Sequence, residues 1–229
     1  MDHLTLPYKK IGDTTIHFDI YPPSTLSQQP KLISTANDLV PRVPAVVYFH
    51  GGGLTVGNRN SLLPTWLQST SEMFWCLPPH IDSVFLGRVT DAGYAFISAD
   101  YRLLPPATGH DILTDIKDLF TFFSSTDFSS HLDVMCLTRA EVDDCYDFPK
   151  FHIDPYSIAV AGTSSGGLCA YLAAMHVSPK PRAVLSLYGM GGDFLVRCYI
   201  VFCTFTDLAR RPHIISFLNP HHFFAAGNS

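Results

Sequence analysis

One serine in this chain lies where a nucleophile would be expected. Ser164 sits between Gly162 and Gly166 in the segment GTSSGG, after the apolar run YSIAVA and before the helical pattern SSGGLCAYLAAMHV. A serine hydroxyl attacks a carbonyl carbon only when a sharply turned backbone exposes it and a base activates it. Glycines at both flanking positions permit that turn, because a Cβ there would collide with the neighbouring strand or helix. The pattern predicts a nucleophile elbow; the alternative is that the hydroxyl caps the helix.

A second glycine-rich motif, HGGG at residues 50–53, directly follows the apolar run AVVYF. Acyl transfer needs backbone N–H groups directed at the developing oxyanion, and consecutive glycines present their amides without obstructing side chains. We expect the N–H groups of Gly52, Gly53 and Ser165 to form this oxyanion hole. A plain glycine turn at a strand end is the alternative for either motif alone, but the two together predict a hydrolase-type site.

The remaining residues of the two motifs are expected to support the site rather than to react. In this arrangement the base follows the nucleophile along the chain, so we expect His50 to fix the glycine loop by a hydrogen bond. The supporting residues are then His50, Gly51, Gly162 and Gly166.

Both motifs follow segments that are typical of parallel strands. Continuous apolar runs at 45–50, 94–100, 156–162 and 182–189 predict strands covered on both faces, and 14–22 predicts an early antiparallel strand. A helix is predicted over 110–123, with Ile112, Ile116, Leu119 and Phe123 on one stripe and Asp111 near its start. This order predicts an α/β fold with a doubly wound, mostly parallel sheet, whose functional residues gather at the carboxyl ends of the strands.

The composition excludes several classes of function. With 47% hydrophobic and 15% charged residues, the chain is expected to fold as a single globular domain over 1–229. A net charge of −5 without a basic run argues against nucleic-acid binding. No apolar stretch reaches the length of a membrane span or has the form of a signal peptide, so a cytoplasmic location is expected. The six cysteines are scattered, which predicts reduced thiols, no metal and no cofactor. The oligomeric state stays open.

Three segments together resemble the hormone-sensitive-lipase-like branch of the α/β-hydrolase fold, which includes carboxylesterases and lipases. They are HGGG at 50–53, SADYRLLP at 98–105, similar to the family's D-Y-R-L-x-P, and GTSSGG at 162–167, similar to its G-D-S-A-G-G. The resemblance extends over residues 14–192. It implies that Ser164 attacks a small-molecule ester and that Asp100, Tyr101 and Arg102 are structural.

The resemblance is incomplete after the nucleophile. It implies an acid and then a histidine on loops after two further strands, but the sequence suggests only one clear strand after Ser164. We expect His176 to be too far along the helix to reach the hydroxyl, and Asp193 to be misplaced for the triad acid. The other candidates lie in an atypical tail, 195–229, without an evident strand: Asp207, His213, His221 and His222.

The sequence also predicts an insert at 69–87, where a proline pair interrupts a predicted helix. Three interpretations remain. The chain is a serine esterase by descent, impaired because its triad acid and histidine are not evident. It is a non-catalytic protein that binds a small ligand in an apolar cleft above the elbow. Or the insert and the tail derive from an imperfect gene model. An impaired esterase would hydrolyse short p-nitrophenyl esters barely above background, whereas a longer chain with the missing strands would recover activity.

Overall fold

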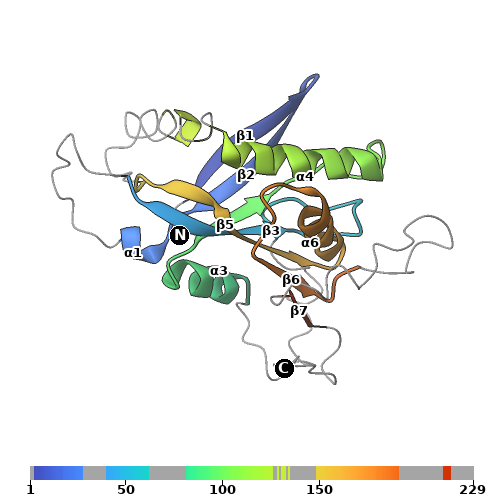
Figure 1. Ribbon diagram of the computed structural model, residues 1–229. Helices are drawn as coiled ribbons and strands as arrows, with labels where there is room; N and C mark the ends of the chain where they lie inside the picture. Colours follow the sequence, from blue (N-terminus) through green and yellow to red (C-terminus); the bar gives the residue numbers. More distant parts are fainter. Residues whose placement is uncertain are drawn as a thin grey trace.

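The chain folds around one mixed β-sheet (Figure 1). The structure is a computed structural model that describes residues 3–27, 40–61, 81–125, 128, 130–132, 134, 148–190 and 214–217. Its sheet has seven strands in the order β1-β2-β4-β3-β5-β6-β7. Their bounds are β1 Leu4–Ile11, β2 Thr14–Tyr21, β3 Arg42–Phe49, β4 Ala95–Ala99, β5 His152–Thr163, β6 Ala183–Leu187 and β7 Ile214–Phe217.

Strand direction divides the sheet into two parts. β1 and β2 form an antiparallel hairpin, and β2 pairs antiparallel with β4. From β4 onward all neighbours are parallel: β4 with β3, β3 with β5, β5 with β6 and β6 with β7. The carboxyl ends of β3 and β5 therefore lie at the same edge, where the two glycine-rich motifs follow them. This confirms the expected mostly parallel α/β sheet.

The helices cover the two faces of the sheet unequally. α4 Gly109–Ser124 and α6 Ser165–His176 pack against each other on one face, while α3 Ile81–Asp91 lies on the other beside the short α1 Ser24–Ser27 (Figure 1). No helix among the described residues is long and apolar enough to cross a bilayer.

The predicted stripe of α4 forms part of the main hydrophobic core. Ile112, Ile116, Leu119 and Phe123 are all buried there. Phe123 meets Phe18 of β2 edge to face, with ring centroids 5.4 Å apart, which is a favourable aromatic arrangement. The helix begins with a capping box in which Thr108 and Asp111 exchange hydrogen bonds, and these bonds lower the pKa of Asp111 below its ordinary value.

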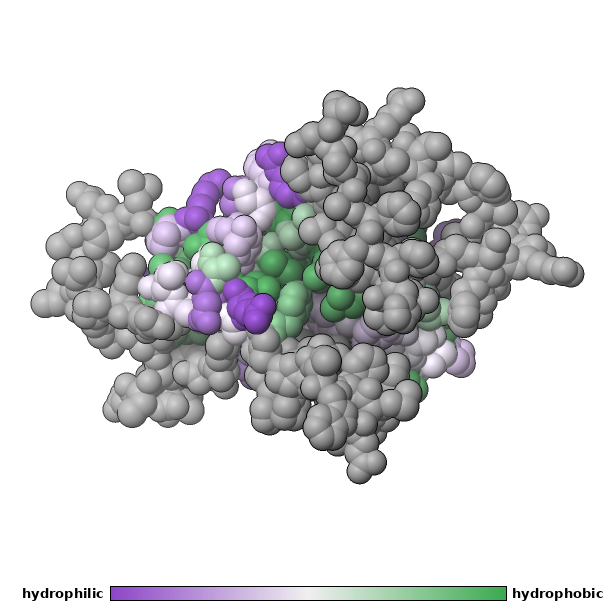
Figure 2. Space-filling model, turned by 90° about the horizontal axis from the view of Figure 1, so that it is seen from below, coloured by the Kyte–Doolittle hydropathy of each residue, from purple (hydrophilic) through white to green (hydrophobic). Residues whose placement is uncertain are grey.

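The α3 side of the sheet carries an apolar groove of about 170 Å³. Figure 2 looks at this side and shows hydrophobic side chains gathered near its centre. The groove is lined by residues of α3, β3, β5 and β6: Val46, Phe85, Val89, Ala159, Val160, Ala161, Ala183, Val184 and Leu185. None of these residues belongs to the elbow or to the HGGG loop, so this groove is distinct from the cleft that the ligand-binding interpretation requires.

The structure corrects one expectation about the tail. Residues 214–217 form strand β7, parallel to β6, whereas the sequence suggested no strand there. A strand of four residues is too short for an alternating apolar pattern to predict it. It forms because it pairs with β6, which lies far away in the sequence. β1 was also absent from the predicted elements. The last residues of the predicted insert, 81–87, belong to α3, while 69–80 lie outside the described residues.

Candidate active site

Ser164 lies at the turn between β5 and α6. Its backbone has φ 51° and ψ −121°, a conformation that is strained for a residue with a Cβ. Three main-chain hydrogen bonds hold it: Ser164 N–H donates to Leu187 O at 3.1 Å, and Ser164 O accepts from Gly167 N–H at 3.0 Å and Met190 N–H at 2.7 Å. These bonds fix the turn through the main chain, independently of the serine side chain.

The Ser164 hydroxyl makes no capping hydrogen bond to α6, although the residue occupies the N-cap position. By contrast, Thr108 caps α4 with its side chain. Ser164 is partly exposed, whereas Thr163 and Ser165 on either side of it are buried. The helix-cap interpretation of this serine therefore has no support in its hydrogen bonds.

The glycines that flank Ser164 are required by close packing. A Cβ on Gly162 would lie 2.1 Å from Gly166 O, and a Cβ on Gly166 would lie 2.0 Å from Phe49 O. Both contacts are with backbone atoms, which cannot move aside as a flexible side chain could. The first turn of α6 therefore packs directly against the end of β3, where the HGGG loop begins.

The HGGG loop turns through an unusual run of backbone conformations. φ is 118° at Gly52, 65° at Gly53 and 65° at Leu54, all in the region that favours glycine. Thr55 N–H and Val56 N–H both donate to Gly52 O at 3.1 Å, which closes the turn on itself. Among the described residues, no acceptor pairs with the N–H of Gly52 or Gly53.

The structure brings the two motifs into contact. Phe49 at the end of β3 is in register with Gly162 of β5. A Cβ on Gly51 would lie 3.2 Å from the Cβ of Ser164 and 3.1 Å from Thr163 O. Next to this contact, the Tyr48 and Thr163 hydroxyls share a buried hydrogen bond of 2.7 Å that links the two strands. The Ser164 turn and the start of the HGGG loop are therefore in direct contact.

His50 is buried beneath the loop. Its Nδ1–H donates to Gly51 O at 2.7 Å, and its ring stacks on Tyr101 with centroids 4.5 Å apart. Tyr101 Oη–H in turn donates to His50 O at 2.7 Å. Burial lowers the pKa of His50 below its ordinary value, which favours the neutral ring. These contacts suit a residue that supports the loop.

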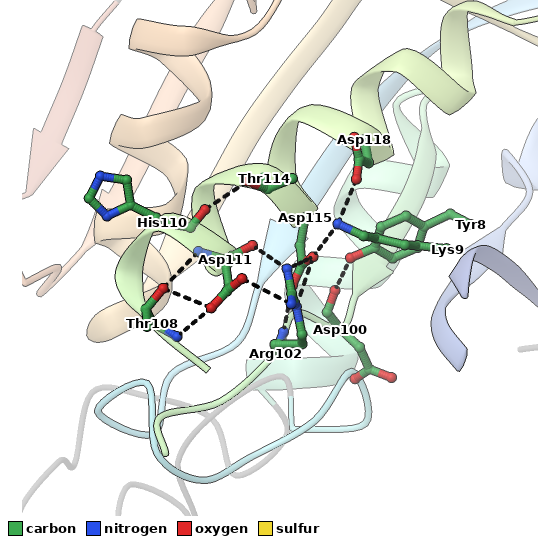
Figure 3. Close-up of polar contacts among 10 residues, drawn as sticks. All are labelled: Tyr8, Lys9, Asp100, Arg102, Thr108, His110, Asp111, Thr114, Asp115 and Asp118. Carbon is green, nitrogen blue, oxygen red and sulfur yellow. Dashed lines mark hydrogen bonds and ion pairs between the residues drawn. The ribbon is translucent and has the colours of Figure 1, made fainter. Parts of the chain in front are cut away.

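Asp100 and Arg102 flank Tyr101 in the chain and bind different parts of the fold. The Asp100 carbonyl accepts a hydrogen bond from Tyr8 Oη–H at 2.8 Å, and its carboxylate binds Arg59. Arg102 forms an ion pair with Asp115 of α4 at 2.8 Å (Figure 3). Arg59 was not singled out from the sequence, because nothing in its neighbourhood indicates partners about 40 residues away.

The base and acid of a triad are not assigned within the described residues. His176 is the last residue of α6, at the opposite end from Ser164. The other candidates all lie outside the described residues: Asp193, Asp207, His213, His221 and His222. The described part of the chain holds no cluster of metal-binding side chains.

A sequence profile described as alpha/beta hydrolase fold matches residues 46–214 of this chain. The chain belongs to the α/β-hydrolase fold family. The expected hormone-sensitive-lipase-like relationship is confirmed by this match, which includes both glycine-rich motifs.

Relatives of this chain are found among proteins of several kinds. It is 28% identical over 148 residues to the protein named "Probable carboxylesterase M8" of Phoma sp., and 28% identical over 193 residues to non-reducing polyketide synthase atr1 of Stereocaulon alpinum. Among solved structures it resembles Thermogutta terrifontis esterase 2, described as phosphorylated by paraoxon, with a TM-score of 0.50 and 16% identity. That likeness concerns the fold.

The chain spans only part of the length of each of these proteins. The matches cover 63% of this chain and 37% of the Phoma protein, 81% of this chain and 6% of the polyketide synthase, and 82% of this chain and 57% of the esterase.

Proposed function

We propose that this chain carries the nucleophile and oxyanion hole of a serine hydrolase that acts on small carboxylic esters. The observation that carries the proposal is the strained Ser164 turn, whose side chain is not used as a helix cap, with the HGGG loop packed against it. A buried or capping serine would need neither the strain nor the loop. The carboxylesterase relative supports the choice of substrate class.

In this proposal Ser164 Oγ attacks the ester carbonyl carbon. The carbonyl π electrons move to oxygen, and the N–H groups of Gly52, Gly53 and Ser165 stabilise the negative charge. Collapse of the intermediate expels the alcohol and leaves an acyl-enzyme, which water then hydrolyses. The proton of the Ser164 hydroxyl must pass to a base, which is not assigned within the described residues. Without a base, the rate is expected to fall by about 10⁴ to 10⁶.

The test is covalent labelling, because a slow modification accumulates where turnover is too slow to see. The purified chain is incubated with paraoxon or a fluorophosphonate and digested, and the modified peptide is identified by mass spectrometry. We expect one adduct, on Ser164, absent from Ser164→Ala. The matched control is Ser165→Ala, which keeps its backbone N–H and should still be labelled.

Turnover of p-nitrophenyl acetate, measured in parallel, tests whether the chain supplies a base for Ser164. We expect hydrolysis barely above background. Robust turnover that is lost in Ser164→Ala and in one variant of a tail histidine would show instead that the tail supplies the base. No adduct on Ser164, together with binding of small esters that Ser164→Ala leaves unchanged, would favour the non-catalytic interpretation.

A second candidate substrate is an acyl thioester. The match to the polyketide synthase extends over more of this chain than the match to the carboxylesterase. Polyketide synthases carry growing acyl chains as thioesters, and the same nucleophile and oxyanion hole would attack a thioester carbonyl. Hydrolysis rates of S-acetyl-N-acetylcysteamine and of ethyl acetate, measured at equal concentrations, would distinguish the two candidate substrate classes. A preference for the thioester beyond its greater intrinsic reactivity would favour this candidate.

A further inference from the structure

Arg59 is bound to the sheet through its main chain and its side chain. It follows the HGGG loop, two residues after Gly57. Its backbone N–H and its Nη1 donate to the two oxygens of the Asp100 carboxylate at 2.6 Å and 2.7 Å. Its Nε donates to Asp19 Oδ1 at 2.8 Å, and its carbonyl accepts from Ser98 Oγ–H at 2.6 Å. One residue thus joins the loop to both β2 and β4.

The attachment of Arg59 to the sheet depends on its positively charged guanidinium group, because both of its side-chain partners are carboxylates. Asp19 has 1% of its side chain exposed, and Arg59 neutralises it together with Asp100. Burial alone would lower the pKa of Arg59, but its hydrogen bonds to the two carboxylates raise that pKa above the ordinary value. Without the guanidinium, the buried Asp19 carboxylate would keep only its hydrogen bond from Thr5 and the His3 ring 4.0 Å away, which is charged only when protonated. Loss of the close cation is therefore strongly unfavourable.

The part of the chain that Arg59 holds is the HGGG loop. The loop begins at His50, which is fixed beneath it, and continues through positive φ at Gly52, Gly53, Leu54 and Gly57. Its central contact with another segment is the bond from Leu104 N–H to Leu54 O at 2.8 Å. A loop that is rich in glycine has many alternative conformations, so both of its ends must be fixed for its amides to stay in place.

We propose that Arg59 is a positioning residue for the oxyanion hole. It fixes the far end of the HGGG loop on Asp19 and Asp100, and thereby keeps the Gly52 and Gly53 amides beside Ser164. It does not itself contact substrate. The catalytic part of this proposal rests on the proposed function, whereas the ordering of the loop can be tested without it.

Arg102 offers a matched control within the same fold. It is also an arginine shared by two carboxylates, with Nε 2.8 Å from Asp115 Oδ2 and Nη1 3.1 Å from Asp111 Oδ1. Figure 3 shows that this cluster ties Arg102 to α4 and that the Asp100 carboxylate points away from it. Lys9 also binds Asp115, so that carboxylate keeps a cation when Arg102 is removed. Loss of Arg102 should therefore affect stability without releasing the HGGG loop.

The first experiment compares hydrogen exchange in Arg59→Met, Arg59→Lys and Arg102→Met. We expect peptides covering 50–58 to exchange about tenfold faster in Arg59→Met than in the parent chain, with no such change in Arg102→Met. Arg59→Lys should lie between, because an ammonium group can neutralise charge but lacks the planar fork. Equal exchange of 50–58 in the two methionine variants would overturn the proposal. If Arg59→Met does not fold, Arg59→Lys and Asp100→Asn provide the same comparison with Arg102→Met.

The second experiment measures the rate at which paraoxon labels Ser164 and the concentration that half-saturates it. We expect Arg59→Met to lower the maximal labelling rate by about tenfold or more with little change in the half-saturating concentration, because oxyanion stabilisation acts in the transition state. A change confined to the half-saturating concentration would overturn the positioning role. If the parent chain itself gives no Ser164 adduct, the proposed function fails, and the exchange experiment alone still decides whether Arg59 orders the loop.

Discussion

The two glycine-rich turns of the site use glycine for different reasons. At the elbow, Gly162 and Gly166 are needed because neighbouring backbone leaves no room for a Cβ, and neither has a positive φ. In the HGGG loop, a Cβ on Gly53 would meet only Thr55 Oγ1, at 3.7 Å, but the residue has a φ of 65°. Gly52 combines a φ of 118° with a Cβ position 2.0 Å from Val56 O. Packing alone requires glycine at the Ser164 turn, whereas in the loop the positive φ angles require it as well.

The two turns are also held differently. The elbow is held by main-chain hydrogen bonds to the carboxyl end of β6 and to the segment that follows it. The loop is held at its far end by the charged side chain of Arg59. A substitution in the tightly packed Ser164 turn should mainly lower the free energy of unfolding. A substitution in the HGGG loop, or of the arginine that holds it, should mainly displace the loop amides. The following predictions test that difference.

The largest effect is expected for Gly166→Ala. Its Cβ would lie 2.0 Å from Phe49 O and 2.6 Å from His50 O, so α6 or the end of β3 would have to move. We expect a loss of more than about 4 kcal/mol in the free energy of unfolding, or no folded protein. Urea denaturation followed by far-UV circular dichroism measures it. A variant with near-parental stability would show that the elbow is less tightly packed than the structure indicates.

A moderate effect is expected where the two turns are joined by the Tyr48 and Thr163 hydroxyls. Tyr48→Phe should lower the free energy of unfolding by about 1 to 3 kcal/mol, because the buried Thr163 hydroxyl loses its partner. Thr163→Val should then cost less in the Tyr48→Phe background than alone. A double-mutant cycle by urea denaturation measures the coupling. Strict additivity of the two changes would contradict a direct link.

A smaller loss of stability is expected for Gly53→Ala. The nearest atom to its Cβ would be Thr55 Oγ1 at 3.7 Å, so the cost comes from the positive φ alone, about 1 to 2 kcal/mol. Labelling of Ser164 by paraoxon should nevertheless slow more than this change in stability would suggest, because in the proposed function the Gly53 N–H is an oxyanion donor and would be displaced. If labelling is unchanged, Gly53 does not contribute to the oxyanion hole.

The smallest effect is expected in the dependence of stability on pH. Burial lowers the pKa of His50, so the unfolded state binds protons more readily than the folded state below about pH 6.5. The stability that this difference contributes should be present above about pH 6.5 and should be lost progressively as the pH falls below it. Melting temperatures at several pH values measure the slope. His176, whose pKa is also lowered by burial, is the control: His176→Asn should keep most of the slope.

The sequence by itself determined the parts of the molecule that depend on local order. The four apolar runs became β3, β4, β5 and β6, and the apolar stripe of 110–123 became the buried face of α4. The two glycine motifs could be placed at strand ends because each directly follows its strand. Such features depend on the spacing of neighbouring residues, which the sequence displays.

Only the tertiary structure decided what depends on distant partners. β7 is a strand because β6 pairs with it, and its four residues carry too little pattern to predict one. Arg59 is bound to Asp19 and Asp100 because the sheet order brings β2 beside β4, which no spacing in the chain reveals. The contact between Gly51 and Ser164 likewise follows from the parallel register of β3 and β5, since hydrogen bonds between strands join residues that are far apart in sequence.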